Sequence, residues 1–190
     1  MNFRSRSGNL TPIWVLIAIN FLVYIVTFIR PDAIDMLGVQ SLTFASQPWT
    51  IVSAMFTHAG FTHFLFNMIT LYFYGMYVLM LVGEVRFWLV YFIGGLAGNA
   101  LYLLLGDPNI AAVGASGAIF ALGGVLAMLV PRMKIMIFPI PFPMDLWIAI
   151  VILALLSLSP GIAWQAHLGG IIVGLAAGYI FKRGARPRPY

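Results

Sequence analysis

The sequence contains no cysteine and very little charge. Only 8% of its 190 residues are charged, and five of these are Asp or Glu. Without cysteine, disulfides and thiol chemistry are excluded, although this absence does not identify a compartment. A chain with so few charges cannot cover a soluble surface, and 62% of its residues are hydrophobic. The composition therefore predicts an integral membrane protein rather than a soluble domain.

Apolar segments of membrane length recur along the chain. Their hydropathy and flanking turn residues predict helices over residues 12–29, 60–81, 86–105, 115–130, 144–158 and 164–182. Thr11 is predicted to cap the first helix, with Pro12 at its first position. No small-residue cleavage site follows this helix, so we interpret it as an uncleaved anchor. The predicted fold class is an all-α polytopic membrane protein, one bundle of six transmembrane helices over residues 1–190.

Three segments are unsuited to crossing a membrane. Residues 30–56 mix proline and aspartate with apolar residues, which is typical of an interfacial loop. Residues 138–144, FPIPFPM, place proline at alternate positions and predict a short extended turn. Residues 183–190 form a basic tail that we expect to be disordered.

The basic residues predict the orientation of the bundle. An even number of spans puts both termini on one side, and that side collects all but one of the ten Lys and Arg residues, namely Arg4, Arg6, Arg86, Arg132, Lys134, Lys182, Arg183, Arg186 and Arg188. Only Arg30 lies opposite, so the positive-inside rule makes both termini cytoplasmic. The net charge of +5 is thereby explained by orientation, and no nucleic-acid partner is expected.

The unusual polar residues occur where three helices begin at the outer face. His58, His63 and Asn67 open the helix over 60–81, Ser116 opens the helix over 115–130, and His167 opens the helix over 164–182. Ionisable residues inside a membrane bundle are costly, and they are functional by default. We therefore expect these side chains to share one layer of the bundle.

The helix that begins near Ser116 is too short to cross a bilayer. At 1.5 Å per residue, residues 115–130 span ~24 Å, against a hydrocarbon core of ~30 Å. The preceding loop must then dip into the membrane beside a water-filled pocket. Small residues spaced by three or four predict that this helix packs closely on the helix of His167, namely Gly117, Ala121 and Gly124 against Gly170, Gly174 and Gly178.

A serine within hydrogen-bond range of a histidine is the minimal activated nucleophile. His167 would take the Ser116 proton as the oxygen attacks a carbonyl. His63 and Asn67, four residues apart on one helix face, and the backbone N–H of Ser116 could stabilise the oxyanion. Phe120, one turn after Ser116, could stack on the His167 ring. No acid is well placed to orient His167, because Asp107 is the only one in the nearby outer loops, so a dyad is predicted.

Three motifs in order resemble the rhomboid family of intramembrane serine proteases: HAGFTHFLFN, GASGAIFAL and AHLGGIIVGLAAG. The resemblance implies that Ser116 is the nucleophile and His167 its base. It also implies that His63 and Asn67 form part of the oxyanion hole. His58, Phe120, Gly114, Gly117 and Gly170 would support the site, with His58 either a polar contact or a ligand to water.

The resemblance further implies what the protein acts on and where. Its substrates would be single-span membrane proteins in the lipid bilayer, cut near their outer ends, and no metal or ATP is expected. The compact chain suggests a multi-pass protein of a prokaryotic plasma membrane, with its active site opening to the extracellular side.

Two positions depart from the family pattern. Many rhomboids carry a Trp-Arg pair in the first loop, whereas here Thr50 follows Trp49. The helix over 60–81 usually carries an acid between two glycines near its cytoplasmic end, and here Leu79 stands between Gly75 and Gly83. Because neither position belongs to the dyad, these departures concern the loop structure and stability.

Other functions remain open from the sequence. An inactive rhomboid-like protein that binds membrane clients would usually lack the serine or the histidine, and this chain keeps both. A metal-dependent hydrolase could use His58, His63 and His167, although two histidines five residues apart do not face one side of a helix. A small transporter with a histidine relay is disfavoured by the lack of an inverted repeat and of a midplane carboxylate.

Overall fold

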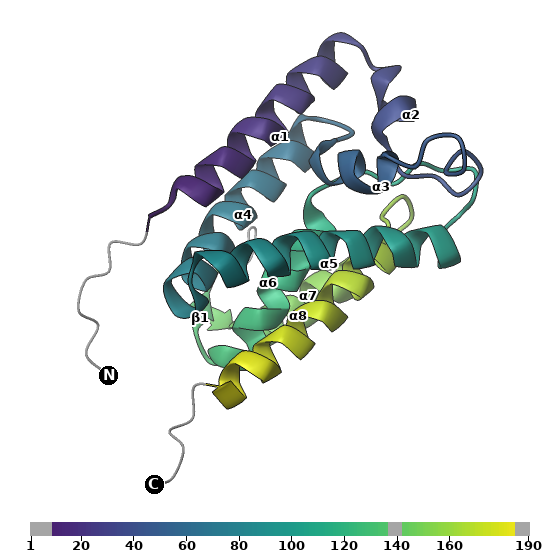
Figure 1. Cartoon of the computed structure of the whole chain (residues 1–190). Coiled ribbons are helices and arrows are strands. Elements are labelled where there is room, and N and C mark those ends of the chain that lie inside the picture. Colours follow the sequence, from purple (N-terminus) through teal and green to yellow (C-terminus); the bar gives the residue numbers. More distant parts are fainter. Residues whose placement is uncertain (1–8, 137–141, 185–190) are drawn as a thin grey trace, which may run out of the picture.

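Long helices dominate the computed structural model, which describes residues 9–136 and 142–184 (Figure 1). The long helices are α1 (Thr11–Ile29), α4 (Phe61–Val82), α5 (Glu84–Leu105), α6 (Ser116–Leu129), α7 (Leu146–Leu156) and α8 (Trp164–Gly184). Each helix overlaps one of the ranges predicted from hydropathy, with ends that differ by at most two residues. The fold is therefore mostly helical, as the composition indicates.

The start of α1 differs from the prediction. Thr11 is the first helical residue rather than the cap, and Leu10 occupies the cap position without a side-chain hydrogen bond. Asn9 takes over the capping contact, because its Oδ1 accepts a hydrogen bond from the backbone N–H of Thr11 at 3.1 Å. Asn is among the preferred residues for satisfying the free N–H groups of a helix start.

The segment 30–56 is more ordered than a plain loop. It contains α2 (Ala33–Leu37), α3 (Thr50–Ser53) and the 3-10 turn η1 (Ala54–Phe56). Trp49 donates from Nε1 to the carbonyl of Met36 at 3.0 Å, which ties α3 to α2. Asn99 of α5 donates to the carbonyl of Ile51 at 2.8 Å. These hydrogen bonds satisfy backbone carbonyl groups that an irregular segment would otherwise leave unpaired.

The connection between α6 and α7 contains two short strands that the sequence did not predict. β1 (Lys134–Ile135) pairs antiparallel with β2 (Met144–Asp145), and Lys134 forms an ion pair with Asp145 at 2.7 Å. Most of the proline-rich turn, residues 138–141, lies outside the described residues, as do Arg4, Arg6 and residues 185–190 of the predicted tail. The prediction of a tail from residue 183 is wrong at its start, since α8 continues through Gly184.

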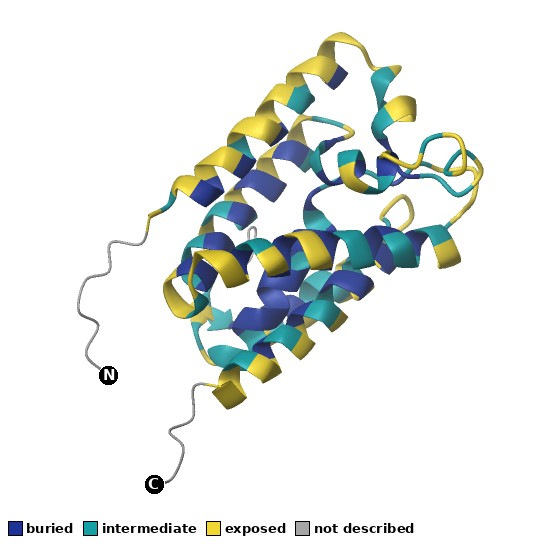
Figure 2. Cartoon of the chain, viewed as in Figure 1, coloured by how far each residue is buried: buried dark blue, intermediate teal, exposed yellow. Residues whose placement is uncertain are grey.

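Helix α6 forms the centre of the bundle. It packs most extensively on α8, and also on α5 and α4. Nine of its 14 residues are buried, all of them small or aliphatic, so much of α6 is dark blue in Figure 2 whereas the outer face of α1 is exposed. Small residues allow neighbouring backbones to approach closely, which explains why this helix can be enclosed on all sides.

Four described helices are long and apolar enough to cross a membrane, namely α1, α4, α5 and α8. The apolar helices α6 and α7 are shorter, with 14 and 11 residues. Large apolar side chains remain exposed on the outer faces, including Phe28 at 70% and Leu22 at 65% on α1. Exposed apolar surface of this extent fits a lipid environment. Helix α1 begins and α8 ends at the same end of the bundle (Figure 1).

Candidate active site

Ser116 is the first residue of α6, immediately after the loop that follows α5. Backbone hydrogen bonds attach the end of this loop to the segment before α4. Ala112 and Val39 exchange two, of 2.8 and 2.9 Å, and the N–H of Gly114 donates to the carbonyl of Ala54 at 2.9 Å. Gly114 has a φ of +132°, a region that other residues rarely adopt. The segment around η1 therefore sets the position of the serine.

His167 lies beside Ser116, with Nε2 at 2.7 Å from the serine Oγ. The two residues belong to α8 and α6, the most extensively packed pair of helices. Their close approach depends on glycine, because a Cβ on Gly170 would overlap the carbonyl oxygen of Gly117. The predicted packing of the two small-residue faces is thus present and brings the two side chains together.

The His167 ring is fixed by an aromatic contact rather than by a carboxylate. Phe120 stacks on it with ring centroids 4.4 Å apart and an interplanar angle of 29°. Nδ1 of His167 is buried without a hydrogen-bond partner in the described part of the chain. Asp107 instead accepts hydrogen bonds from the backbone N–H and side chain of Asn109 at 2.9 and 3.2 Å. Among the described residues, no acid accepts a hydrogen bond from His167.

His63 and Asn67 approach the serine from α4. A Cβ built on Gly114 would lie 2.9 Å from Nε2 of His63 and 3.4 Å from Oγ of Ser116, so the ring and the hydroxyl border the same small space. The side chain of Asn67 is buried, and its Nδ2 donates to the carbonyl of His63 at 2.8 Å. One amide hydrogen of Asn67 is therefore used within α4, and the second is left for the site.

His58 lies behind His63 rather than at the serine. It is 1% exposed, and its ring meets the edge of His63 with centroids 5.1 Å apart and the edge of Phe64 at 5.6 Å. Burial lowers the pKa of His58 to about 3, so the ring is neutral at ordinary pH. The structure thus places the His58 ring against His63.

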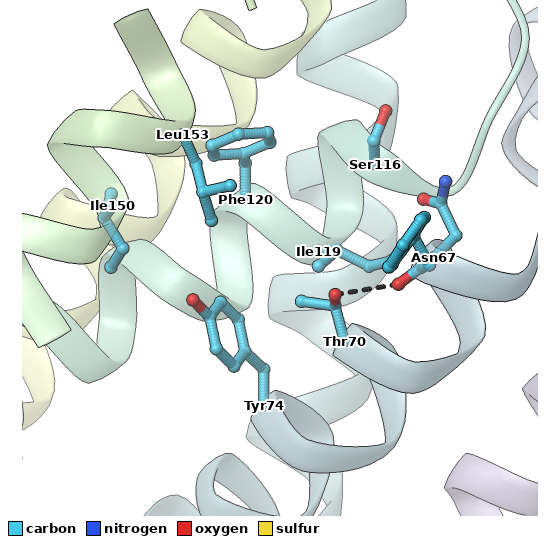
Figure 3. A pocket seen from close by; sticks show the side chains of 9 residues that line it. Asn67, Thr70, Tyr74, Ser116, Ile119, Phe120, Ile150 and Leu153 are labelled. Carbon is cyan, nitrogen blue, oxygen red and sulfur yellow. Dashed lines mark hydrogen bonds between the residues drawn. The ribbon is translucent and has the colours of Figure 1, made fainter. Parts of the chain in front are cut away.

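Two cavities meet at Ser116 and Asn67. The larger, about 820 Å³, is lined by His63 and His167 and by the loops that precede α6 and α8. The smaller, about 140 Å³, runs from Ser116 and Asn67 between α4, α6 and α7, and beyond these two residues it is apolar except for Thr70 and Tyr74 (Figure 3). This second cavity could not be predicted from the sequence, because its wall residues, including Ile150 and Leu153, are of the types that pack any helical bundle.

No group of three His, Cys, Asp or Glu side chains within residues 9–136 and 142–184 is arranged to hold a metal ion. His58 and His63 meet ring edge to ring face, and His167 is bonded to Ser116. The three histidines therefore do not point to a common centre.

The chain is similar to known proteins of one family. The Rhomboid domain family matches residues 45–184. RHOMBOID-like protein 4 of Arabidopsis thaliana is 32% identical over 145 residues, 76% of this chain and 36% of that protein. RHOMBOID-like protein 2 of the same plant is 36% identical over 135 residues, 70% of this chain and 42% of that protein. Rhomboid-type serine protease 2 of Emericella nidulans is 31% identical over 144 residues, 72% of this chain and 27% of that protein.

The chain spans less than half the length of each of these three relatives. The matched range covers α4 to α8 and every residue predicted for the site. The apolar helices together with this domain indicate a multi-pass membrane protein. The resemblance seen in the sequence motifs is confirmed, and the chain is a member of the rhomboid family.

Proposed function

We propose that this protein is an intramembrane serine endopeptidase that hydrolyses peptide bonds in or near transmembrane segments with a Ser116–His167 dyad. The observation that carries the proposal is the 2.7 Å contact between Ser116 Oγ and His167 Nε2 at the edge of a cavity of about 820 Å³. A serine hydroxyl is a weak nucleophile unless a base within hydrogen-bond reach accepts its proton.

The first half of the reaction forms an acyl-enzyme. Oγ of Ser116 attacks the peptide carbonyl carbon while Nε2 of His167 takes the hydroxyl proton. The tetrahedral intermediate collapses, the C–N bond breaks, and His167 passes that proton to the leaving amine. The stacked Phe120 ring holds the imidazole in line for both transfers, a role that a carboxylate fills in a triad.

The second half uses water. A water molecule from the large cavity attacks the ester carbonyl as Nε2 of His167 accepts its proton, and the ester C–O bond breaks. The proton returns to Oγ of Ser116, which restores the enzyme and releases the acid. The cavity is lined by the loops before α6 and α8 and by polar side chains such as Asp107, Ser159 and Gln165, which can admit water to a site among membrane helices.

The negative oxygen of each intermediate requires donors. His63 borders the space beside Gly114, Asn67 has one amide hydrogen left, and the first turn of α6 offers N–H groups without an intrahelical acceptor. Donors already aimed at the developing charge are usually the largest contribution to acyl-transfer catalysis. We assign His63 and Asn67 to this role, and His58 to supporting His63.

The substrates proposed are single-span membrane proteins. The apolar cavity between α4, α6 and α7 begins at Ser116 and suits a segment that leaves lipid to reach the serine. We further propose six membrane crossings with both termini cytoplasmic in a plasma membrane, so that the site opens to the extracellular side. The supporting observation is that the described cations Arg86, Arg132, Lys134, Lys182 and Arg183 lie near the start of α5, after α6 and at the end of α8, away from Ser116.

The decisive experiment needs no knowledge of the substrate. The purified chain in detergent is treated with a fluorophosphonate, and the adduct is located by mass spectrometry. We expect labelling of Ser116 that is lost in Ser116→Ala and in His167→Ala, while Ser46→Ala, which changes an exposed loop serine, labels normally. A folded protein without an adduct on Ser116, or undiminished labelling in His167→Ala, would contradict the dyad and favour the inactive client-binding alternative.

The oxyanion donors are tested by a partial effect. Removing one such donor costs about 3 to 4 kcal/mol in a soluble serine protease. We expect Asn67→Ala to slow labelling, with a loss smaller than this energy, because His63 and the backbone N–H groups remain as donors. Equal rates for Asn67→Ala and the unmodified chain would remove Asn67 from the site.

A further inference from the structure

A second polar site lies at the opposite end of α6 from Ser116. A cavity of about 230 Å³ is lined by Met128 near the end of α6 and by Tyr179, Lys182 and Arg183 in the last turns of α8. It shares no residue with the two cavities at Ser116. Any ligand held here is therefore distinct from the substrate of the proposed protease.

The protein holds both cations in place without neutralising them. Nζ of Lys182 donates to the carbonyl of Met128 at 3.3 Å, one of the carbonyls that a helix end leaves without an intrahelical donor. The guanidinium of Arg183 lies over the Tyr179 ring, 4.6 Å from its centroid. Among the described residues, the ion pairs are Arg30–Asp32 and Lys134–Asp145, so Lys182 and Arg183 have no acidic partner.

The surroundings of the cavity add to its positive charge. The same end of the bundle carries Arg86, whose guanidinium lies 5.2 Å from the centre of the Phe181 ring, and Arg132 in the turn after α6. Its described acids are Glu84 at the start of α5 and Asp145, and Asp145 is already paired with Lys134. An anionic ligand would supply the charge that the protein itself does not.

An apolar stripe on α8 leads to this cavity. Leu168, Ile172, Leu175 and Tyr179 are spaced by three or four residues, which places them on one face of a helix. All four are exposed, from 38% for Leu175 to 55% for Ile172, and the stripe ends at Lys182 and Arg183. Apolar surface with two cations at its end complements a phospholipid. The apolar part can contact the acyl chains, and the cations can bind the phosphate.

We propose that this site binds an anionic phospholipid, with its phosphate at Lys182 and Arg183 and its acyl chains along the Leu168–Tyr179 stripe. The proposed ligand is a membrane lipid rather than a free phosphate, because a lipid has acyl chains that can contact the stripe and a free phosphate has no apolar part. Tyr179 lies at the junction, and an aromatic ring with a polar tip is typical of the headgroup level of a membrane. Basic pockets between membrane helices bind anionic headgroups in the same way.

The test uses native mass spectrometry of the full chain in detergent, with phosphatidylglycerol or phosphatidylcholine of equal chain length added. We expect the unmodified chain to retain the anionic lipid at least about tenfold better, since each cation near a headgroup contributes favourably. Lys182→Gln with Arg183→Gln should abolish this preference. The matched control, Arg86→Gln with Arg132→Gln, removes the same charge from the same end but not from the cavity, and should keep the preference.

Three outcomes would overturn the proposal. Equal retention of both lipids by the unmodified chain would show no headgroup recognition. A similar loss in the two double variants would indicate diffuse attraction to the whole basic end instead of a site. Displacement of the lipid by inorganic phosphate at millimolar concentration would assign the cavity to a soluble anion. Thermal unfolding of all variants checks that they fold, and the result stands whether or not Ser116 proves to be a nucleophile.

Discussion

Gly170 lies so close to the carbonyl oxygen of Gly117 that no side chain fits between α8 and α6 at this point. Three residues before Gly170, His167 reaches Ser116, the residue before Gly117. The distance between the two helix backbones therefore sets the distance between base and nucleophile. Any added atom at this crossing would move the two side chains apart.

We expect Gly170→Ala to abolish fluorophosphonate labelling of Ser116. Inserting a methyl group into a packed contact typically costs 1 to 3 kcal/mol, and relief of the overlap requires the helices to separate. Gly184→Ala is the matched control, because it makes the same change in α8 where a Cβ would meet nothing within 4 Å. Labelling of Ser116 in a folded Gly170→Ala protein at the normal rate would refute the link between packing and chemistry.

Gly114→Ala should also abolish labelling, for a different reason. The φ of +132° is strained for alanine, and the methyl group would lie 2.9 Å from His63 Nε2, in the space assigned to the oxyanion. Strain of this kind costs about 1 to 3 kcal/mol, which thermal unfolding can measure. Gly60→Ala, with an extended backbone and nothing within 4 Å, should label like the unmodified chain. Normal labelling of Gly114→Ala would mean that this space is not used.

Phe120→Leu tests whether stacking orients the base. An aromatic pair of this geometry contributes about 0.5 to 1.5 kcal/mol, so the labelling rate should fall by up to about tenfold. The thermal midpoint should change little, since Phe120 is half-buried. Phe73→Leu, at a 52% exposed position on the outer side of α4, should leave the labelling rate unchanged. An unaltered rate in Phe120→Leu would leave the orientation of His167 without an explanation.

Asp107→Asn distinguishes a dyad from a triad. Asp107 accepts hydrogen bonds within its own turn, and His167 Nδ1 has no partner in the described part of the chain. We expect the rate of labelling to stay within twofold of the unmodified chain. In soluble triads, replacing the aspartate lowers the rate by about four orders of magnitude. A loss of that size here would show that Asp107 acts on His167.

A chelator should not affect labelling. The three histidines do not converge on one centre within the described residues, and the proposed steps move protons only between Ser116, His167, water and substrate. Labelling is measured before and after treatment with 1,10-phenanthroline, with added zinc as the reverse test. Inhibition by the chelator that zinc reverses would revive the metal-dependent alternative.

Some features of the molecule could be predicted from the sequence because they depend on neighbouring residues. An apolar run of membrane length forms a helix wherever it lies in the bundle, so the long helices begin and end close to the predicted residues. The candidate site is predictable for a related reason: so apolar a chain has few polar residues, and Ser116, His63, Asn67 and His167 all lie near the starts of helices. Capping was less predictable, since Asn9 rather than Thr11 supplies the bond to the helix start.

Other features depend on contacts between residues far apart in the sequence, and these became visible in the folded chain. The segment 30–56 is held by bonds such as Asn99 to Ile51, 48 residues apart, and Ser41 to Leu103, 62 residues apart. The apolar cavity beside Ser116, the burial of His58 behind His63 and the cation pair at Met128 arise in the same way. Local sequence alone predicts the helices and the residue types at their starts. The packing of small residues between α6 and α8 decided the 2.7 Å contact, because only backbones in direct contact bring residues 51 positions apart so close.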